Sequence, residues 1–296
     1  MSKPTVAILG LGIMGSGMTA RLLSAGFSVS IYNRSRDKAR PLADRGAFLA
    51  GRPREAAERS EVVLSMVADD AASRGVWLGE DGALAGSSRN SVLIESSTLS
   101  VGWVKELAAA AENRGCEFLD APVTGTKPHA ESGQLLFLVG GPSAALEKAR
   151  PVLSVLGRDV VYLGPNGSGA LMKLINNFLA AVQAVSFGEA LALIRAGGLD
   201  YEKAVSILTE GVPGSPMVKR VATRAASGDF SPHFFLRLMA KDVGYAIQEA
   251  RQRNLSLPTA AAALAVFQQA IANGYGEQDF TAVIESLGSP HALSPA

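Results

Sequence analysis

The sequence predicts two domains of different class: an α/β domain built on a doubly wound parallel sheet, and after it an all-α domain. One observation is that short apolar, β-branched runs alternate with helical segments as far as Leu163. A second is that the spacing stays helical over residues 169–287, with no convincing strand. The change of pattern places the boundary at residues 164–167, with domains over 1–165 and 166–296.

The expected strands of the first domain are compact apolar runs, at residues 5–9, 28–32, 62–66, 92–95, 117–120, 136–139 and 160–163. Helical spacing lies between them, most clearly over residues 101–114 and 143–156. The helices expected in the second domain cover residues 169–197, 201–208, 217–226, 236–254, 259–273 and 279–287. The first of these is long enough to serve as a hinge and as the floor of a cleft between the domains. The tail over 288–296 is expected to be frayed.

Composition narrows the classes of function. The 296 residues are 48% apolar and 19% charged, which is typical of a globular protein with sizeable cores. The net charge of +1 and the absence of basic runs argue against a nucleic-acid partner. Cys116 stands alone, so neither an internal disulfide nor a metal site is expected, and a reducing compartment is favoured. No apolar run reaches the length of a membrane span without a glycine or a charge, and we expect a cytoplasmic protein.

The glycine-rich stretch after the first strand predicts a dinucleotide site. A strand, a G-x-G-x-x-G turn and a helix follow one another in the order of a Rossmann-type entry. We expect Gly10 to make the tight turn, Gly12 to admit the pyrophosphate and Gly15 to allow close packing of helix on strand. The cofactor-binding residues expected here are Gly10, Leu11, Gly12, Ile13, Met14 and Gly15. Taken alone, such a glycine pattern is also compatible with a purely structural turn.

The end of the second strand bears on which nucleotide binds. An acid at this position hydrogen-bonds the ribose of NAD and repels a 2′-phosphate, but the sequence has Asn33, Arg34 and Ser35 there, followed by Arg36. Arginine and hydroxyl donors suit the 2′-phosphate, so NADP (NADPH) is favoured. The alternative is an ordinary solvated arginine pair at a helix start.

Ligands of parallel sheets bind beyond the carboxyl ends of the strands, which singles out Val67 and Thr98. Thr98 is as well explained by capping of the helix that begins near Val101. A further candidate is the segment over 121–133, which we expect to be a loop because it is polar and rich in Pro and Gly.

In that loop Thr124, Gly125 and Thr126 offer two hydroxyls and an unhindered amide, a plausible cradle for a small carboxylate. A plain surface turn is the alternative reading of the loop. Nothing pairs His129 with an acid and a nucleophile, so it is not expected to be a general base.

The start of the long helix carries Lys173 among apolar residues, with Asn177 one turn further along the same face. Lys173 either extends to the surface along the core or faces a polar cleft beside Asn177 and a ligand. In the helix expected over 236–254, Lys241 is as well explained by solvation as by ligand contact. Asp242 has an explanation in the helix dipole, because acids are favoured near a helix N-terminus.

Four spaced motifs carry a resemblance to a known family: GLGIMGSGM at 10–18, DAPVTGT at 120–126, GALMKLINN at 169–177, and KD at 241–242. Over nearly its whole length the chain resembles the β-hydroxyacid dehydrogenases, relatives of 6-phosphogluconate dehydrogenase. The resemblance implies that Lys173 is catalytic, that Asn177 orients the substrate, and that Thr124, where serine is common, and Gly125 bind the substrate carboxylate. It also implies a set of residues that line the nicotinamide cofactor, namely Met66, Thr98, Phe235 and Lys241.

Within the family, NRS after the second strand and GTKPHAESGQ in the substrate loop look most like the NADPH-dependent glyoxylate and succinic semialdehyde reductases. Lys127 and Pro128 stand where that branch often has two lysines before the proline. The expected reaction is hydride transfer between NADP(H) and a small aldehyde acid or its hydroxy acid, with Lys173 as general acid and base. The alternatives are a 3-hydroxyisobutyrate or tartronate semialdehyde type of dehydrogenase, an imine reductase-like relative, which generally lacks the lysine, or a non-catalytic dinucleotide sensor. We also expect a homodimer or homotetramer.

Overall fold

The computed structural model describes residues 3–287, which form two compact units. The first unit comprises Met1–Lys173 and the second Leu174–Ala296. This division lies inside one helix, α9 (Ser168–Ala196), which begins in the first unit and ends in the second. The segment over 288–296, for which we expect fraying, lies outside the described residues.

The first unit is organised around one sheet with the strand order β3-β2-β1-β4-β5-β6-β8-β7, and β9 pairs with β8. The strands are β1 (Val6–Leu9), β2 (Val29–Tyr32), β3 (Phe48–Leu49), β4 (Val62–Ser65), β5 (Val92–Glu95), β6 (Glu117–Asp120), β7 (Val123–Thr124), β8 (Leu135–Gly140) and β9 (Gly157–Gly164). Pairing is parallel from β3 through β6 and between β8 and β9, whereas β8 runs antiparallel to β6 and β7. The expected, mostly parallel, doubly wound sheet is confirmed.

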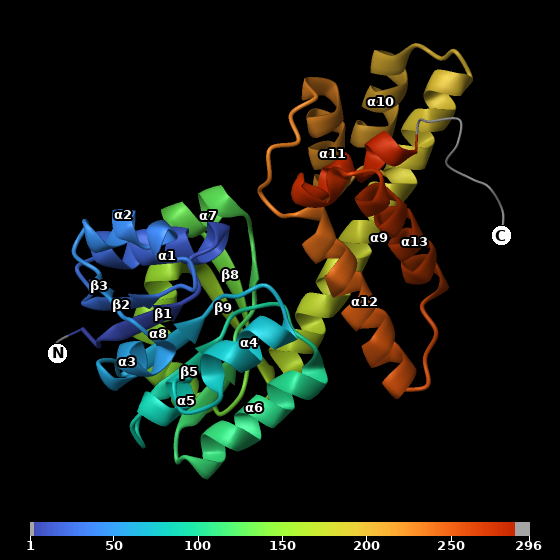
Figure 1. Cartoon of the computed structure of the whole chain (residues 1–296). Helices are drawn as coiled ribbons and strands as arrows, with labels where there is room; N and C mark the ends of the chain where they lie inside the picture. The colour runs from blue at the N-terminus through green and yellow to red at the C-terminus, as the bar shows by residue number, and fades with distance from the viewer. Residues whose placement is uncertain (1–2, 288–296) are drawn as a thin grey trace. The chain divides into compact units, whose positions relative to one another are not determined.

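Helices connect the strands of this sheet (Figure 1). They are α1 (Ile13–Ser24), the 3₁₀ turn η1 (Arg36–Lys38), α2 (Arg40–Ala43), α3 (Pro53–Glu58), α4 (Asp70–Trp77), α5 (Ala83–Gly86), α6 (Val101–Asn113), α7 (Lys127–Ser132) and α8 (Ser143–Leu156). Helix α1 packs against α7 and α8. Fully buried β1 and the inward faces of α1 and α8 form the core, because strands covered on both faces must be apolar throughout.

The second unit is helical, as the sequence predicts, and the strand pattern does not return in it up to Leu287. After α9 come α10 (Tyr201–Glu210), α11 (Pro216–Ser227), α12 (Leu236–Gln252), α13 (Pro258–Ala272), and the 3₁₀ turns η2 (Tyr275–Glu277) and η3 (Phe280–Ser286). Apolar side chains of α9, α11, α12, α13 and η3 pack into a second core.

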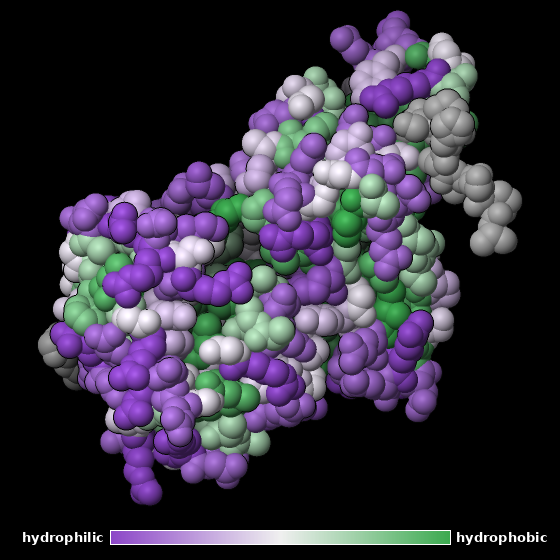
Figure 2. All heavy atoms as spheres, in the orientation of Figure 1, coloured by the Kyte–Doolittle hydropathy of each residue, from purple (hydrophilic) through white to green (hydrophobic). Residues whose placement is uncertain are grey.

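The sequence predicts no membrane span, yet helix α9 has the length and composition of one. Half of its most apolar stretch is buried inside the protein, as is common for the central helix of a folded core. Length and composition therefore give only weak evidence about a membrane. On the face drawn in Figure 2, hydrophilic residues predominate and apolar ones are interspersed among them.

Candidate functional site

The glycine-rich turn between β1 and α1 is tightly packed at Gly10 and Gly15 and has free space at Gly12. Gly10 has a φ of 97°, and a Cβ placed there would lie 2.4 Å from the Met66 carbonyl oxygen. A Cβ at Gly15 would lie 2.0 Å from the carbonyl oxygen of Gly10, so helix and turn meet through glycine alone. A Cβ at Gly12 meets nothing within 4 Å, and Gly12, the N-cap residue, has no side chain to cap the amides at the start of α1. This geometry fits a pyrophosphate at the helix N-terminus.

Asn33 ties this turn to the end of β2. Its Oδ1 accepts a hydrogen bond from the Leu11 amide at 2.9 Å, and its Nδ2 donates to the Ser35 carbonyl at 2.8 Å. Leu11 itself is buried, whereas Ile13 and Met14 are half-buried at the start of α1. The Asn33 side chain thus holds two expected cofactor segments in register with each other.

Arginines dominate the segment after β2. Arg34, Ser35 and Arg36 are all exposed. Within residues 3–287 neither Arg34 nor Arg36 forms an ion pair with an acid, whereas neighbouring Arg40 is 3.4 Å from Asp37. Both guanidinium groups are therefore available to an external anion.

A buried carboxylate that sequence reasoning missed lies at the end of β5. Glu95 is fully buried and accepts hydrogen bonds from Ser73 Oγ (2.7 Å), Trp77 Nε1 (2.8 Å) and the Ser97 amide (2.9 Å). Ser97 Oγ in turn accepts from the Val67 amide at 2.7 Å. Burial raises the pKa of the Glu95 carboxyl, and the hydrogen bonds from Ser73 and Ser97 partly offset that rise. The two hydrogen bonds of Ser97, with the Glu95 carboxylate and the Val67 amide, link the segment after β4 to the segment after β5.

The structure separates the two explanations of Thr98. The residue that caps α6 is Ser100, whose Oγ accepts from the Trp103 amide at 3.2 Å. Asp70 fixes Ser100 in place by accepting from its amide at 3.0 Å and from its hydroxyl at 2.5 Å. Thr98 is half-buried two residues before this cap. Capping of α6 is therefore wrong as an explanation of Thr98.

The expectation of a loop over the whole of 121–133 is wrong. The segment contains β7, which pairs with β8, and the short helix α7. Thr126 is the N-cap of α7, Pro128 occupies its first turn, where proline is well tolerated, and Gly133 ends it at a φ of 71°. These same turn-forming residues gave the segment its loop-like composition.

Between β7 and α7 the backbone bends at Gly125, with a φ of 136°. A Cβ at Gly125 would lie 2.9 Å from Leu135 Cδ2 and 3.1 Å from His129 Cβ, so a side chain is excluded. Thr124 and Thr126, on either side, are half-buried. The three residues expected to hold a carboxylate thus lie on one tight bend.

The start of α9 is anchored to the end of β6 by Asp120. This carboxylate is buried, and its Oδ1 accepts from the Gly167 amide at 2.8 Å while its Oδ2 accepts from the Ala170 amide at 2.9 Å. Asn166 Nδ2 also donates to Oδ1, at 3.4 Å. Burial raises the pKa of the Asp120 carboxyl, and the amides of Gly167 and Ala170 partly offset the rise.

Lys173 follows this anchor within the first turns of α9 and is the last residue of the first unit. Lys173 is half-buried. Lys173 therefore lies three residues after Ala170, whose amide binds the carboxylate at the C-terminal end of β6.

In the second unit, Asn177 is buried and donates from Nδ2 to Asp242 Oδ2 at 2.6 Å. Lys241 Nζ lies 3.0 Å from Asp242 Oδ1 and 5.2 Å from the centroid of the Tyr245 ring. The dipole explanation of Asp242 is wrong, because α12 begins at Leu236 and Asp242 lies in its second turn. Its burial is explained by the partners Asn177 and Lys241, a pairing across 65 positions that local patterns do not reveal.

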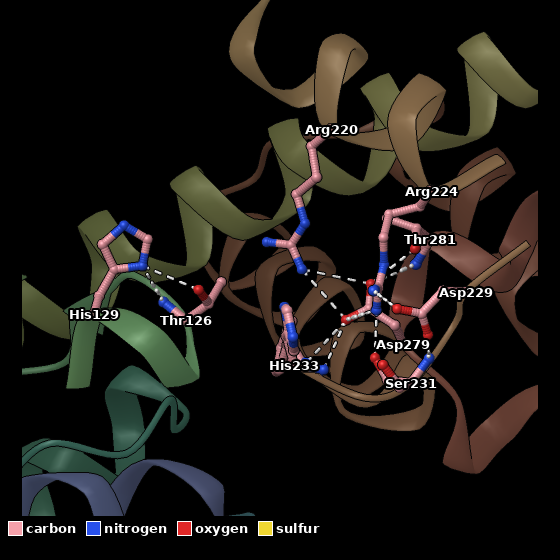
Figure 3. Close-up of polar contacts among 10 residues, drawn as sticks. Thr126, His129, Arg220, Arg224, Asp229, Ser231, His233, Asp279 and Thr281 are labelled. Carbon is pink, nitrogen blue, oxygen red and sulfur yellow. Dashed lines mark hydrogen bonds and ion pairs between the residues drawn. The ribbon is translucent and has the colours of Figure 1, made fainter. Parts of the chain in front are cut away.

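Phe235 is the N-cap residue of α12 and forms a β-bridge with Asp279. Asp279 is buried and accepts from the amides of His233 (3.0 Å) and Phe234 (3.1 Å) and from Thr281 Oγ1 (2.8 Å). Figure 3 shows His233, Thr281 and Arg220 of α11 converging on this one carboxylate. The segment that carries Phe235 is therefore fixed by a second acid that sequence reasoning missed.

Both the α/β part and the helical part of the chain match known protein families. Residues 5–164 match the family described as the NAD binding domain of 6-phosphogluconate dehydrogenase. Residues 167–287 match the family described as NAD-binding of NADP-dependent 3-hydroxyisobutyrate dehydrogenase. The chain belongs to the β-hydroxyacid dehydrogenase family. As a β-hydroxyacid dehydrogenase it has the expected fold, a Rossmann-type domain followed by a helical domain.

Three relatives illustrate the range of this family. The chain is 35% identical to the NAD-dependent L-serine dehydrogenase of Pseudomonas aeruginosa, over 96% of this chain and 98% of that one. It is 34% identical to the chloroplastic glyoxylate/succinic semialdehyde reductase 2 of Arabidopsis thaliana, over 96% and 79% respectively. The solved 3-hydroxyisobutyrate dehydrogenase of Mycobacterium tuberculosis with L-serine superimposes with a TM-score of 0.89 at 31% identity, over 97% of this chain and all of that one. These relatives are NAD(P)-dependent oxidoreductases of small hydroxy or aldehyde acids.

Proposed function

We propose that this β-hydroxyacid dehydrogenase interconverts a small aldehyde acid, of the glyoxylate or succinic semialdehyde type, and its hydroxy acid with NADP(H). The observation that carries the proposal is the position of Lys173. It lies in the first turns of a helix whose start is fastened by Asp120 to the end of β6. Ligands of such folds bind beyond the carboxyl ends of the strands.

The bound nicotinamide nucleotide would supply or accept the hydride. In reduction, negative charge develops on the carbonyl oxygen, and the Lys173 ammonium would stabilise this charge and donate the proton. In oxidation, neutral Lys173 would accept the hydroxyl proton. Thr124, Gly125 and Thr126 would orient the substrate through its carboxylate, using hydroxyl and amide donors on the tight bend.

The choice of NADP rests on the segment after β2. Arg34 and Arg36 are exposed and lack acidic partners within the described residues, and Ser35 adds a hydroxyl. A 2′-phosphate placed there would gain charge-assisted hydrogen bonds that the ribose hydroxyl of NAD cannot offer.

A panel assay tests the reaction directly. The purified protein would be given NADPH or NADH with glyoxylate, succinic semialdehyde or tartronate semialdehyde, and NADP or NAD with the corresponding hydroxy acids. We expect oxidation of NADPH with glyoxylate or succinic semialdehyde. Failure to oxidise NADPH with any of the three aldehydes would remove the proposed reaction.

Arg34→Ala tests the choice of nucleotide separately. The variant should raise the KM for NADPH at least about tenfold more than the KM for NADH, because a charged hydrogen bond contributes about 1.5–3 kcal/mol. Arg150→Ala is a matched control, since Arg150 is an exposed arginine on α8 paired with Glu147. Equal effects of Arg34→Ala on both nucleotides would contradict a phosphate-binding role.

Oxidation of L-serine with NAD is the second candidate. It is favoured by the 35% identity to an L-serine dehydrogenase and by the L-serine in a solved relative. It predicts turnover of L-serine with NAD when L-serine is added to the panel, and no preference for NADPH. An imine reductase-like activity is disfavoured, because that branch generally lacks the lysine found at position 173.

We also propose that the chain acts as a cytoplasmic homodimer or homotetramer. The second unit leaves several large apolar side chains exposed along α9 and α10 and in the loops that follow them, namely Leu193, Leu199, Ile207 and Val212. Such side chains are often covered in an oligomer. Light scattering coupled to gel filtration would distinguish a monomer from these assemblies.

A further inference from the structure

His129 is built into the cap of the helix that follows the carboxylate cradle. Its Nδ1 lies 3.1 Å from the backbone nitrogen of Thr126 and 3.0 Å from Thr126 Oγ1, as Figure 3 shows. A backbone N–H can only donate a hydrogen bond, so Nδ1 must offer a lone pair. The contact therefore requires a ring without a proton on Nδ1, which the imidazolium form does not provide.

This contact is one half of a capping box. Thr126 is the N-cap of α7 and His129 is its third helical residue. That third position is usually filled by glutamate or glutamine, whose oxygen accepts from the N-cap amide. In this chain the acceptor is an imidazole, whose Nδ1 loses its lone pair when the ring binds a second proton.

The charged groups around α7 have other partners. On α7 itself Lys127 and Glu131 are 3.8 Å apart, and both are half exposed. On α1, which packs against α7, Arg21 Nε donates to the Val155 carbonyl at 3.2 Å. The neighbouring strand β8 has no titratable side chain from Leu135 to Gly140. His129 is exposed, so solvent protons reach the ring.

The His129 side chain lies against two residues of the proposed carboxylate cradle, Gly125 and Thr126. The His129 Cβ lies against Gly125, where an added Cβ would approach it to 3.1 Å. The Nδ1 atom accepts from the Thr126 amide, and the Thr126 hydroxyl lies beside the same atom. Protonation would release the Thr126 amide and leave its hydroxyl facing a donor instead of an acceptor.

We propose that His129 is a positioning residue for the substrate, which holds Thr126 in its binding geometry only while the ring is neutral, so that substrate binding weakens as the pH falls. The inference rests on the proposed function in one respect, the assignment of residues 124–126 to the substrate carboxylate. Charge alone predicts the opposite sign, because a protonated ring beside the cradle would attract an anionic substrate. The sign of the pH effect therefore separates positioning from simple attraction.

The kinetic test compares the wild type with His129→Gln and His129→Ala between pH 5.5 and 8. The wild-type KM for the aldehyde acid should rise at least about fivefold from pH 8 to pH 5.5, as the ring gains a proton. His129→Gln retains an acceptor that does not titrate, so its KM should match the wild-type value at pH 8 and stay nearly constant. His129→Ala should have a raised KM at every pH, with the KM for NADPH unchanged in all three proteins.

His233→Gln is the matched control, since His233 is the other histidine within residues 3–287. It should keep the wild-type pH dependence of KM. A wild-type KM that falls or stays constant on acidification, or a His129→Gln variant that keeps the wild-type pH dependence, would overturn the proposal.

A second test does not depend on turnover. Hydrogen exchange of the Thr126 amide in the full chain should be slower in the wild type than in His129→Ala at pH 8. On acidification the wild-type Thr126 amide should lose its protection, when it is compared with the same amide of His129→Gln at the same pH. Equal protection of wild type and His129→Gln at every pH would overturn the proposal. The expected loss of protection, in a protein that turns over none of the panel, would contradict the proposed function alone.

Discussion

Each unit of the molecule contains a buried aspartate that binds backbone amides, and the two are used differently. Asp120 in the first unit receives the amides of Gly167 and Ala170, at the start of α9. Asp279 in the second unit receives the amides of His233 and Phe234, just before α12. Both residues fasten a segment that carries an expected functional side chain.

The difference lies in the charge of their partners. Within residues 3–287 the hydrogen bonds to the Asp120 side chain come from neutral donors. Asp279 also faces two arginines, with Arg220 Nη2 at 3.3 Å and Arg224 Nη2 at 3.8 Å. Burial lowers the pKa of the Arg220 guanidinium, and Asp279 partly offsets that effect.

This contrast shows that a buried aspartate can either form the centre of an ion-pair network, as Asp279 does, or fix the start of a helix, as Asp120 does. Removal of Asp279 leaves the amides of His233 and Phe234 and the half-buried Arg220 without this partner, a cost to stability. Substitution of Asp120 disturbs chiefly the helix turn that leads to Lys173, so a cost to turnover is expected.

Asp279→Ala should produce the largest change in stability. The variant should lower the free energy of unfolding of the helical unit by about 3–5 kcal/mol, because it breaks a buried ion pair and leaves donors unsatisfied. Native-state hydrogen exchange of α11 and α12 amides measures this loss. Glu210→Ala, which removes the exposed pair of α10 with Lys219, should cost less than about 1 kcal/mol. Equal losses in the two variants would show that the Asp279 cluster has no special weight.

Asp120→Asn should have a smaller effect on stability and a clear effect on turnover. The amide retains one acceptor but places N–H groups towards an amide donor, so the first turn of α9 must shift. A displacement of reacting groups by about 1 Å can cost a hundredfold in rate, and we expect kcat to fall about 10- to 100-fold. The KM for NADPH should stay within about twofold of the wild-type value.

Asp200→Asn controls for the chemical change, since Asp200 caps α10 by accepting from the Lys203 amide at 3.1 Å. Its kcat should remain that of the wild type. A folded Asp120→Asn protein with wild-type turnover would break the comparison, because both aspartates would then be merely structural.

Local patterns in the sequence were sufficient to predict an α/β unit followed by a helical one. The alternation of strand and helix up to Leu163 predicts the sheet, and the loss of that alternation predicts the helical unit. The G-x-G-x-x-G turn is likewise a local signal, and the structure shows the close approach at Gly10 and Gly15 that the turn implies.

The missed features depend on tertiary contacts. The segment over 121–133 has the composition of a loop, yet the Thr126 cap and packing against α1 make part of it helical. Asn177 and Asp242 meet across 65 positions, and Asp279 binds amides that precede it by 45 and 46 positions. An acid at the end of an apolar strand, as at Glu95 and Asp120, is the one signal that could have indicated such anchors.

Turnover by Lys173→Ala tests the central claim, that this lysine performs the proton transfer. NADPH affinity and kcat would be measured with the aldehyde acid that the wild type reduces, beside Lys203→Ala, which removes an exposed lysine of α10. We predict a loss of kcat of about 10²- to 10⁴-fold in Lys173→Ala with nearly unchanged NADPH affinity, and wild-type values for Lys203→Ala. Wild-type turnover in a folded Lys173→Ala protein would contradict the account.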